Sequence, residues 1–311
     1  MCDVDMEKKI LVVSSANMDF VMKTDSVPSA GQTLVSDKSY KYVPGGKGAN
    51  SAVAFSRLGG ECVFCTRLGS DANGDTLHAL YEREGISTDF IARDPEAPTG
   101  LAAILVESNG ANRIIVYPGA NMNIDEKTVD DAIAVRPNAL YMQMEISYSA
   151  IIHAAKKASE AKIPIFIDAG PADRDFPFEQ LPYLEIFSPN EHETEILTGI
   201  YPADEDSCRL AAGALSKLVK AKYFVIKLGA RGAYVTDGKR EFIAPPFKAE
   251  AKDTTAAGDS FTAALTLEYL RTNNIERAAR YANAVGAIVV SREGAIPSIP
   301  FADEVENFLK A

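Results

Sequence analysis

Short apolar runs alternate along this chain with longer segments in which apolar residues recur every three or four positions. The short runs predict strands and the periodic segments predict helices. The predicted strands are residues 10–14, 63–67, 139–144, 163–168, 186–188, 223–228 and 233–236. The predicted helices between them include residues 148–161, 191–198 and 207–220. This alternation predicts an α/β fold, in which helices cover both faces of a mostly parallel sheet.

Two stretches, at about 20–42 and 99–116, do not fit this alternation and have the pattern of extended segments interrupted by Pro and Gly. They predict additional strands outside the parallel sheet. Ligands of open parallel sheets bind beyond the carboxyl ends of the strands. Asn17, Asp168, Asn190 and Gly229 each follow a predicted strand, so we expect a binding site at this edge.

Composition limits the classes of function. The 311 residues are enough for one large or two modest domains, and 47% are hydrophobic, which is ample for a core. The net charge of −11 argues against a nucleic-acid partner, which would require a basic face. No apolar run approaches the ~20 residues of a membrane span, and residues 1–9 lack the apolar core of a signal peptide. We therefore expect a cytoplasmic protein without a membrane partner.

The cysteines do not predict a metal site. Cys62 and Cys65 have a spacing found in zinc sites, but no second pair accompanies them and the chain has only 3 histidines. Their segment has the pattern of a strand. Together with Cys2 and Cys208 they are interpreted as reduced structural thiols, in keeping with a cytoplasmic location.

The segment 253–259, Asp-Thr-Thr-Ala-Ala-Gly-Asp, leads directly into an apolar helical pattern. The first N–H groups of a helix lack intrahelical partners, and the small side chains of Ala256, Ala257 and Gly258 leave them open to an anion. Asp259 stands in the first turn, where its carboxylate can accept a proton. An anion cradle beside a base suits phosphoryl transfer to a hydroxyl. The alternative is a capped helix start after a tight turn.

A second glycine-rich loop, residues 45–50, follows a predicted strand at 40–43 and opens a helix that runs to about residue 58. Lys47 lies inside the glycine run and no Ser or Thr follows it, so the loop is not a Walker A motif. Backbone that a ligand can approach closely, together with a cation and the amide of Asn50, suits a polyhydroxylated ligand. The alternative is a glycine-rich turn between strand and helix.

With both loops in place, the sequence resembles the PfkB family of carbohydrate kinases and, within it, the branch that phosphorylates D-ribose. The two loops reproduce the family's two signatures. Supporting segments follow in the family's order at 17–19, 141–145, 188–193, 227–232 and 294–298. The resemblance implies one domain over 1–311, a three-layer α/β/α fold with a small β-sheet lid inserted from about 20–42 and 99–116. It also implies a homodimer formed through the lid sheets.

The implied reaction is ATP-dependent phosphorylation of D-ribose at its primary 5-hydroxyl, which yields ribose 5-phosphate and ADP. By this resemblance, Asp259 is the base, and the amides of Ala256, Ala257 and Gly258 stabilise the charge on the transferred group. The residues expected to bind the sugar are Asn17, Asp19, Gly45, Gly46, Lys47, Asn50, Glu145 and Asp259.

The resemblance also implies sites for ATP, Mg²⁺ and K⁺. The expected ATP-binding residues are Asn190, Lys227, Gly229, Ala230, Gly232, Gly258 and Asn283. Glu193 is expected to hold Mg²⁺ through water, although Asn190 and Glu193 also have the spacing of a helix capping box. The expected K⁺ site consists of Asp253, Thr255, Val289, Arg292, Gly294 and Ser298.

Other functions stay open at this level. Many members of the ribose-phosphorylating branch carry Thr where this chain has Lys227, whereas other branches carry Lys. A nucleoside, deoxyribose or ketose kinase is therefore an alternative within the family. A sensor that retains the fold without the chemistry is an alternative outside the enzymes, but the intact Asp259 argues against it.

Overall fold

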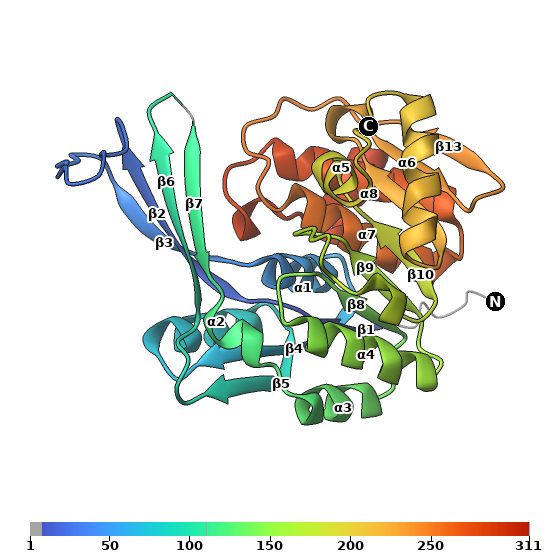
Figure 1. Ribbon diagram of the computed structural model, residues 1–311, viewed down its shortest axis with the longest axis horizontal. Coiled ribbons are helices and arrows are strands. Elements are labelled where there is room, and N and C mark those ends of the chain that lie inside the picture. The colour runs from blue at the N-terminus through green and yellow to red at the C-terminus, as the bar shows by residue number, and fades with distance from the viewer. Residues whose placement is uncertain (1–7, 110, 311) are drawn as a thin grey trace.

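The computed structural model describes residues 8–109 and 111–310, which form two sheets with helices packed around the larger one (Figure 1). The large sheet has the strand order β13-β12-β11-β10-β9-β8-β1-β4-β5. All neighbours from β11 to β5 are parallel, whereas β12 and β13 are antiparallel. The strands are β1 Lys9–Val13, β4 Glu61–Gly69, β5 Ser87–Asp94, β8 Ala139–Met142, β9 Ile165–Asp168, β10 Leu184–Ser188, β11 Ala221–Lys227, β12 Ala233–Thr236 and β13 Glu241–Ala244.

Helices cover both faces of this sheet, because alternate side chains of each buried strand point to opposite faces. Ile10 and Val12 of β1 belong to one hydrophobic cluster with α1, α2, α7, α8 and α9. Leu11 and Val13 belong to the other, with α3, α4, α5 and α6. The predicted three-layer α/β fold is confirmed. The helices are α1 Lys47–Arg57, α2 Ala72–Arg83, α3 Glu126–Ala134, α4 Tyr148–Glu160, α5 Glu191–Thr198, α6 Glu205–Leu218, α7 Ala257–Thr272, α8 Ile275–Val290 and α9 Ala302–Lys310.

The sequence pattern did not predict the edge strands of the large sheet, and it misplaced the ends of two inner strands. The edge strands β5 and β13 were not predicted, because β5 carries polar residues on both faces and β13 is only 4 residues long. The predicted strand at 139–144 ends at Met142, so Met144 and Glu145 lie beyond the sheet. The predicted strand at 163–168 starts at Ile165, after Pro164.

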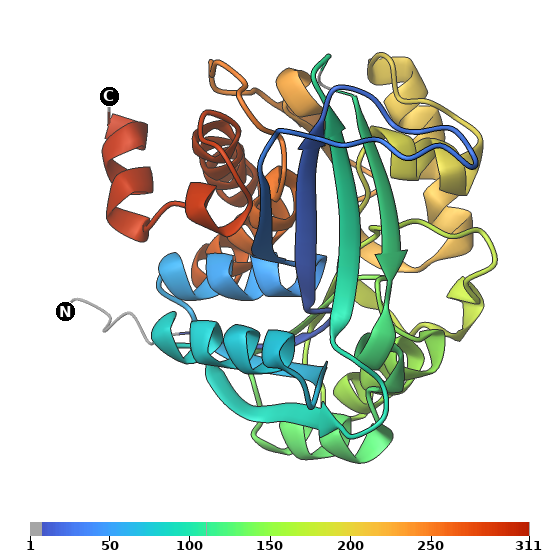
Figure 2. The same ribbon diagram turned by 90° about the vertical axis from the view of Figure 1, so that its left-hand side faces the viewer.

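The small sheet has the order β3-β2-β6-β7 and lies across the front of Figure 2. Its strands are β2 Asn17–Thr24, β3 Tyr40–Gly45, β6 Gly100–Glu107 and β7 Asn112–Tyr117. Strand β2 pairs in parallel with β6 and antiparallel with β3. Because side chains alternate along each strand, one face of this sheet points toward the large sheet's binding edge and the other points outward.

The start of α1 lies against the segment that follows β1, and this contact determines where the glycine loop sits. Gly46 has φ +90°, and a Cβ there would lie 2.7 Å from the backbone nitrogen of Asn17. A Cβ on Gly48 would lie 2.5 Å from Ser14 Cβ and 2.5 Å from the carbonyl oxygen of Ser15. Glycine is therefore required at both positions for α1 to begin this close to β1.

No helix within residues 8–109 and 111–310 combines the length and apolar character needed to cross a membrane.

We predict that Gly48→Ala destabilises the protein by about 1–3 kcal/mol, because the added methyl group overlaps Ser14 and Ser15 and forces α1 to move. The matched control is Gly213→Ala in α6, where nothing lies within 4 Å of an added Cβ. That change is expected to stabilise the helix by about 0.5–1 kcal/mol. Urea unfolding of both variants measures the difference, and equal effects of the two substitutions would contradict the proposed close approach.

Candidate active site

Helix α7 begins without a side-chain cap. Its N-cap residue, Ala256, has φ 62°, and no side chain hydrogen-bonds to the first-turn amides. A positive φ is uncommon for a residue other than glycine and is often found at functional sites. The backbone N–H of Ala257 donates to the carbonyl of Thr254 at 3.2 Å. The alternative interpretation of this segment as a side-chain-capped helix start therefore has no support in the geometry, and the helix end is open to an anion.

Asp259 accepts hydrogen bonds from two buried amides. Asn50 Nδ2 donates to Asp259 Oδ2 at 2.9 Å, and Gln143 Nε2 donates to Oδ1 at 3.1 Å. Lys47 Nζ lies 4.0 Å from Oδ1. Burial raises the pKa of the Asp259 carboxyl above its usual value, and the Lys47 ammonium opposes this shift. The same pairing raises the pKa of Lys47. Both glycine-containing loops thus meet at one carboxylate.

A polar cavity of about 420 Å³ opens beside Asp259. It collects Asn17 and Asp19 of β2, the first turn of α1 and Glu145 beyond β8. One wall is apolar and comes from the small sheet. The lining residues that carry the expected sugar-binding roles are Asn17, Asp19, Gly46, Lys47, Asn50, Glu145 and Asp259. The apolar wall consists of Ala102, Ile104, Ile114 and Val116.

Gly45 was expected to bind the sugar, but unlike Gly46 and Lys47 it does not line the cavity. A Cβ at Gly45 would lie 2.2 Å from Asp19 Oδ2, so the glycine provides the space that the Asp19 carboxylate occupies. Burial and the negative charge of Glu145 raise the pKa of Asp19 to about 7. Glu145 itself accepts from Ser15 Oγ at 2.5 Å and from the backbone N–H of Lys47 at 3.1 Å.

Sequence reasoning did not identify Asn121, which orients Asn17. Asn121 Nδ2 donates to Asn17 Oδ1 at 2.8 Å, and Asn121 Oδ1 accepts from the N–H of Ala16 at 2.9 Å. The residue lies in a short 3₁₀ turn, Gly119–Asn123, far away in the sequence. A buried asparagine in an irregular segment has no sequence pattern that would reveal this contact.

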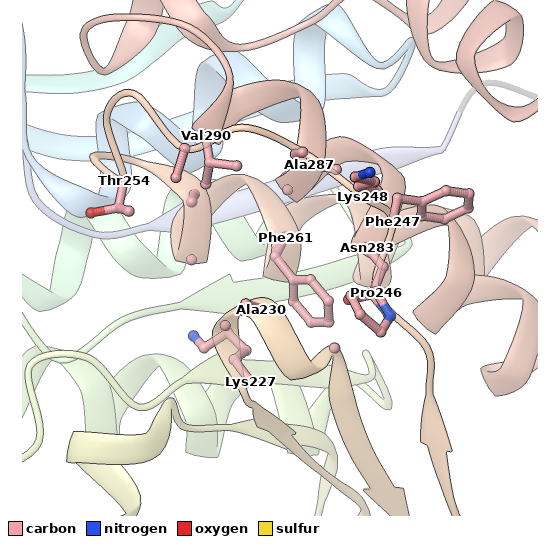
Figure 3. A pocket seen from close by; sticks show the side chains of 17 residues that line it. Lys227, Ala230, Pro246, Phe247, Lys248, Thr254, Phe261, Asn283, Ala287 and Val290 are labelled. Carbon is pink, nitrogen blue, oxygen red and sulfur yellow. The ribbon is translucent and has the colours of Figure 1, made fainter.

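A second cavity, of about 620 Å³, lies on the other side of the α7 N-terminus (Figure 3). The expected ATP-binding residues that line it are Lys227, Gly229, Ala230, Gly232, Gly258 and Asn283. Much of its remaining wall is apolar and includes Pro246, Phe247, Phe261, Ala287 and Val290. Asn190 instead lines the polar cavity. The two cavities share Lys227, Thr254 and Gly258, so they meet at the start of α7.

Asn283 uses its amide to hold one wall of the second cavity. Its Nδ2 donates to the carbonyl oxygens of Ala244 and Pro245, both at 3.0 Å. These bonds attach the segment after β13 to α8. In Figure 3 Asn283 lies next to Pro246 and Phe247. Both amide hydrogens are therefore committed to backbone, and the side chain shapes the cavity wall.

Lys227 forms a buried ion pair at the junction of the cavities. Its Nζ lies 2.5 Å from Asp168 Oδ2, and the side chains are only 9% and 3% exposed. Thr262 Oγ1 of α7 also donates to Asp168 Oδ2, at 2.6 Å. Asp168 was noted in the sequence only for its position after a predicted strand. Its carboxylate at the end of a fully buried strand was the available signal, because such a charge must be paired.

Asn190 and Glu193 form a capping box at the start of α5. Asn190 Oδ1 accepts from the N–H of Glu193 at 2.8 Å, and Glu193 Oε2 accepts from the N–H of Asn190 at 2.7 Å. Both residues nevertheless line the polar cavity. Burial raises the pKa of Glu193, against the effect of Lys227. Asn190 and Glu193 therefore cap the helix and line the cavity at the same time.

The residues expected to hold K⁺ lie on the loop before α7, at the end of α8 and in the segment that follows α8. Asp253 Oδ1 accepts from the N–H and Oγ1 of Thr255 at 2.9 and 2.6 Å, and Oδ2 accepts from the N–H of Gly294 at 2.9 Å. Burial alone would raise the pKa of Asp253, but these hydrogen bonds hold it below its usual value. Within the same group, Arg292 pairs with Glu304 at 2.6 Å.

Val289 lies in the last turn of α8, and Ser298 lies in the 3₁₀ turn Ile296–Ser298. Val289 accepts from the N–H of Arg292 at 3.1 Å, and Ser298 Oγ donates to the carbonyl of Ala295 at 2.6 Å. Among residues 8–109 and 111–310, no cluster of three or more His, Cys, Asp or Glu side chains has a metal-binding arrangement. Cys62, Cys65 and Cys208 are free and buried, and Cys2 lies outside the described residues.

Comparison with known proteins accounts for this arrangement. Residues 7–302 match the model of the pfkB family of carbohydrate kinases. The ribokinase of Haemophilus influenzae is 35% identical over 308 residues, which cover 98% of this chain and 99% of that protein. The deoxyribokinase of Salmonella typhi is 29% identical and covers 96% of this chain and 98% of its own length.

The solved structures include a similar protein with ligands. The structure of Arabidopsis thaliana ribokinase complexed with ribose and ATP superimposes with a TM-score of 0.89 at 32% identity. The alignment covers 98% of this chain and 100% of that one. The family resemblance drawn from the two loops is thus confirmed over nearly the whole sequence, and the chain belongs to the pfkB family of carbohydrate kinases.

Proposed function

We propose that this sugar kinase transfers the γ-phosphoryl group of ATP to the 5-hydroxyl of D-ribose and releases ribose 5-phosphate and ADP. The observation that carries the proposal is the meeting of the two cavities at the start of α7. Gly258 lines both cavities and Asp259 lines the polar one. A larger, mostly apolar space suits the adenosine part of ATP, and a small polar space suits a pentose. The ribokinase relatives support this assignment.

The polar cavity offers ribose both acceptors and donors. Asp19 accepts from neighbouring sugar hydroxyls, and Glu145 accepts from another. Asn50 also lines the cavity, and its buried Oδ1 has no hydrogen-bond partner among the described residues. Lys47 and Asn17 complete the contacts. Because a buried acceptor left unpaired costs free energy, this set favours a fully hydroxylated pentose over an analogue that lacks a hydroxyl.

In the chemical step, Asp259 accepts the proton of the 5-hydroxyl as that oxygen attacks the γ-phosphorus. A bond forms between the sugar oxygen and phosphorus while the bond from phosphorus to the β,γ-bridging oxygen breaks. ADP leaves with that electron pair. The backbone N–H groups of Ala256, Gly258 and Asp259 stabilise charge on the transferred group, whereas the N–H expected from Ala257 already donates to the carbonyl of Thr254. Positioning supplies most of the acceleration, since the transition state is loose.

Lys227 places a cation where the two cavities join. Its ammonium group, held by Asp168, contacts the phosphate chain as a point charge. Gly229, Ala230 and Gly232 allow ATP to approach the backbone after β11, and Asn283 supports the adenine side of the cavity through the segment that it holds. Asn190 lies next to the phosphates.

Two cations complete the proposed site. Glu193, buried and facing the polar cavity, fits Mg²⁺ binding through water, since Mg²⁺ keeps several waters and takes few protein ligands. The ionised Asp253 and the carbonyl-rich loops around Gly294 fit K⁺, which would order the segment before α7. When bound, Mg²⁺ neutralises phosphate charge. A rate that stayed flat when K⁺ was added to a K⁺-free assay would exclude the K⁺ site.

The small sheet is proposed to act as a lid and as a dimer interface. Its inner residues wall the polar cavity and keep water from the transferred phosphoryl group. Its outer face exposes large apolar side chains, including Ile115 at 75%, Tyr40 at 64% and Tyr117 at 55%. Such a face fits burial against the same face of a second copy. A chain that sedimented as a monomer at micromolar concentration would exclude this homodimer.

We predict that D-ribose is the preferred acceptor. ADP release from MgATP with K⁺ present is measured with D-ribose, 2-deoxyribose, D-fructose, adenosine and no sugar. We expect kcat/KM for ribose to exceed that for 2-deoxyribose by about tenfold or more, because the missing hydroxyl leaves a buried acceptor unpaired. Turnover mainly with adenosine, fructose or deoxyribose would still be consistent with a kinase of this family, but it would show that ribose is not the preferred substrate. Absence of turnover with all of them would favour the sensor.

We predict that Asp259→Asn lowers kcat by about 10²- to 10⁴-fold, because the amide cannot accept the hydroxyl proton. The control is Asp237→Asn in an exposed turn, where the side-chain oxygen still accepts from Lys239 and Arg240. That variant should retain the wild-type rate. Full turnover by Asp259→Asn in the same assay would remove Asp259 from the role of base.

We predict that ribose affinity falls as the pH decreases through about 7, the pKa of the Asp19 carboxyl. The sugar hydroxyls donate to both oxygens of the carboxylate form, so protonation of Asp19 removes the negative charge and turns one acceptor oxygen into a donor. Well below the pKa, the dissociation constant should rise about tenfold for each pH unit. Titration calorimetry without nucleotide avoids the ionisation of ATP. Asp19→Asn is the control, and a wild-type pH dependence that persisted in this variant would assign the effect to another group.

A further inference from the structure

Gln143 lies behind the proposed base and does not border either cavity. Its side chain is completely buried, and it belongs to the segment that follows β8. Nε2 donates to Asp259 Oδ1 at 3.1 Å, and Oε1 accepts from Ser14 Oγ at 3.1 Å. Since Gln143 is absent from the cavity linings, it has no route to the substrate except through Asp259.

The direction of the Gln143 amide follows from its two partners. Ser14 is also completely buried, just after β1, and its hydroxyl points at Oε1. The opposite orientation of the amide would place a carbonyl oxygen against the Asp259 carboxylate, which is repulsive. Gly48 packs against Ser14, so the start of α1 fixes the serine from the other side. The hydrogen-bonded chain Ser14, Gln143, Asp259 therefore has one favourable arrangement.

The charge around Asp259 explains why a neutral donor is needed there. Burial and the Asp168 carboxylate oppose ionisation of Asp259 and raise its pKa, whereas Lys47 and Lys227 favour the ionised form. Asn50 and Gln143 each donate to one carboxylate oxygen, so both oxygens are held as acceptors. Hydrogen bonds to the charged form favour that form. The charged and titratable groups that line the cavity or act on Asp259 are Asp19, Lys47, Tyr141, Glu145, Asp168, Glu193 and Lys227.

We infer that Gln143 is a positioning residue of the phosphoryl transfer, whose amide holds Asp259 in the ionised state and in a fixed orientation, with Ser14 fixing the amide in turn. The inference rests on the proposed function for the role of Asp259 as base. It goes beyond that function because it assigns control of the base's protonation to a side chain that never contacts sugar or nucleotide. It predicts that loss of the amide changes the pH dependence of turnover while leaving sugar affinity at high pH unchanged.

The test uses Gln143→Glu and Gln143→Met in the full chain. The first places a carboxyl group beside Asp259, and the second removes the donor from a side chain of similar length without adding charge. We expect the acidic limb of the kcat–pH profile to move to higher pH in both, by about one to two units in Gln143→Glu and by less in Gln143→Met. The KM for the sugar at pH 8.5 to 9, about two units above the Asp19 pKa, should stay within about twofold of wild type.

A readout that needs no substrate separates this inference from the proposed function. The ¹³C carboxyl shift of Asp259, assigned by its loss in Asp259→Asn, reports the pKa directly. An increased pKa in both Gln143 variants supports the positioning role, even if ribose proves not to be the substrate. The inference would be wrong if the pKa of Asp259 stayed unchanged in both Gln143 variants. It would also be wrong if turnover slowed without a shift of the pH profile, because Gln143 would then have only a structural role.

Two further variants test the inference in case the Gln143 substitutions prevent folding. Ser14→Ala leaves Gln143 in place but frees its amide, so a smaller shift in the same direction is expected, and no shift would count against the inference. Ser188→Ala is the matched control, because this buried hydroxyl at the end of β10 has no hydrogen-bond partner among the described residues. Its pH profile and Asp259 pKa should equal those of wild type.

Discussion

The hydrogen bond between Asn50 and Asp259 joins the two loops on which the rest of the site depends. It spans 209 positions in the sequence and lies in the protein interior. Asn50 is in the first turn of α1 and Asp259 in the first turn of α7, so the bond fixes two helix starts against each other. Both residues line the polar cavity, and Gly258, next to Asp259, also lines the second cavity. A shift of the start of α1 would change the polar cavity, whereas a shift of the start of α7 would change both cavities, because Gly258 lines both.

Apolar packing offsets the free energy that is lost when this polar pair is buried. Helices α1, α7 and α8 share one hydrophobic cluster with alternate residues of the central strands. The close approach of α1 to β1 is possible only because Gly46 and Gly48 lack side chains. Apolar packing thereby holds the carboxylate, the ammonium of Lys47 and the amides in place, and their mutual hydrogen bonds satisfy groups that would otherwise be buried unpaired.

The two sheets contribute different groups to the candidate active site. The small sheet contributes Asp19 and an apolar wall on one side of the polar cavity. The large sheet contributes Asp168 and Lys227 at the ends of β9 and β11. Asp168 lines the polar cavity, and Lys227 lines both cavities. In the proposed reaction, the small sheet covers the sugar, and the large sheet holds the charged groups at the junction of the cavities. This division suits a reaction that must exclude water.

The sequence by itself determined the α/β alternation and the two loops, but not the edge strands β5 and β13. Hydrophobic periodicity and glycine runs are local properties, so β1, α4 and α5 and the loops at 45–50 and 253–259 could be recognised without knowledge of their neighbours. Only the tertiary structure decided the side-chain partners. Gln143, Asn121 and the Asp168–Lys227 pair act through contacts between distant elements, and Asn283 donates to backbone of the wall that it helps to form. Such contacts depend on strand order and on which helix starts converge, and no local pattern encodes these.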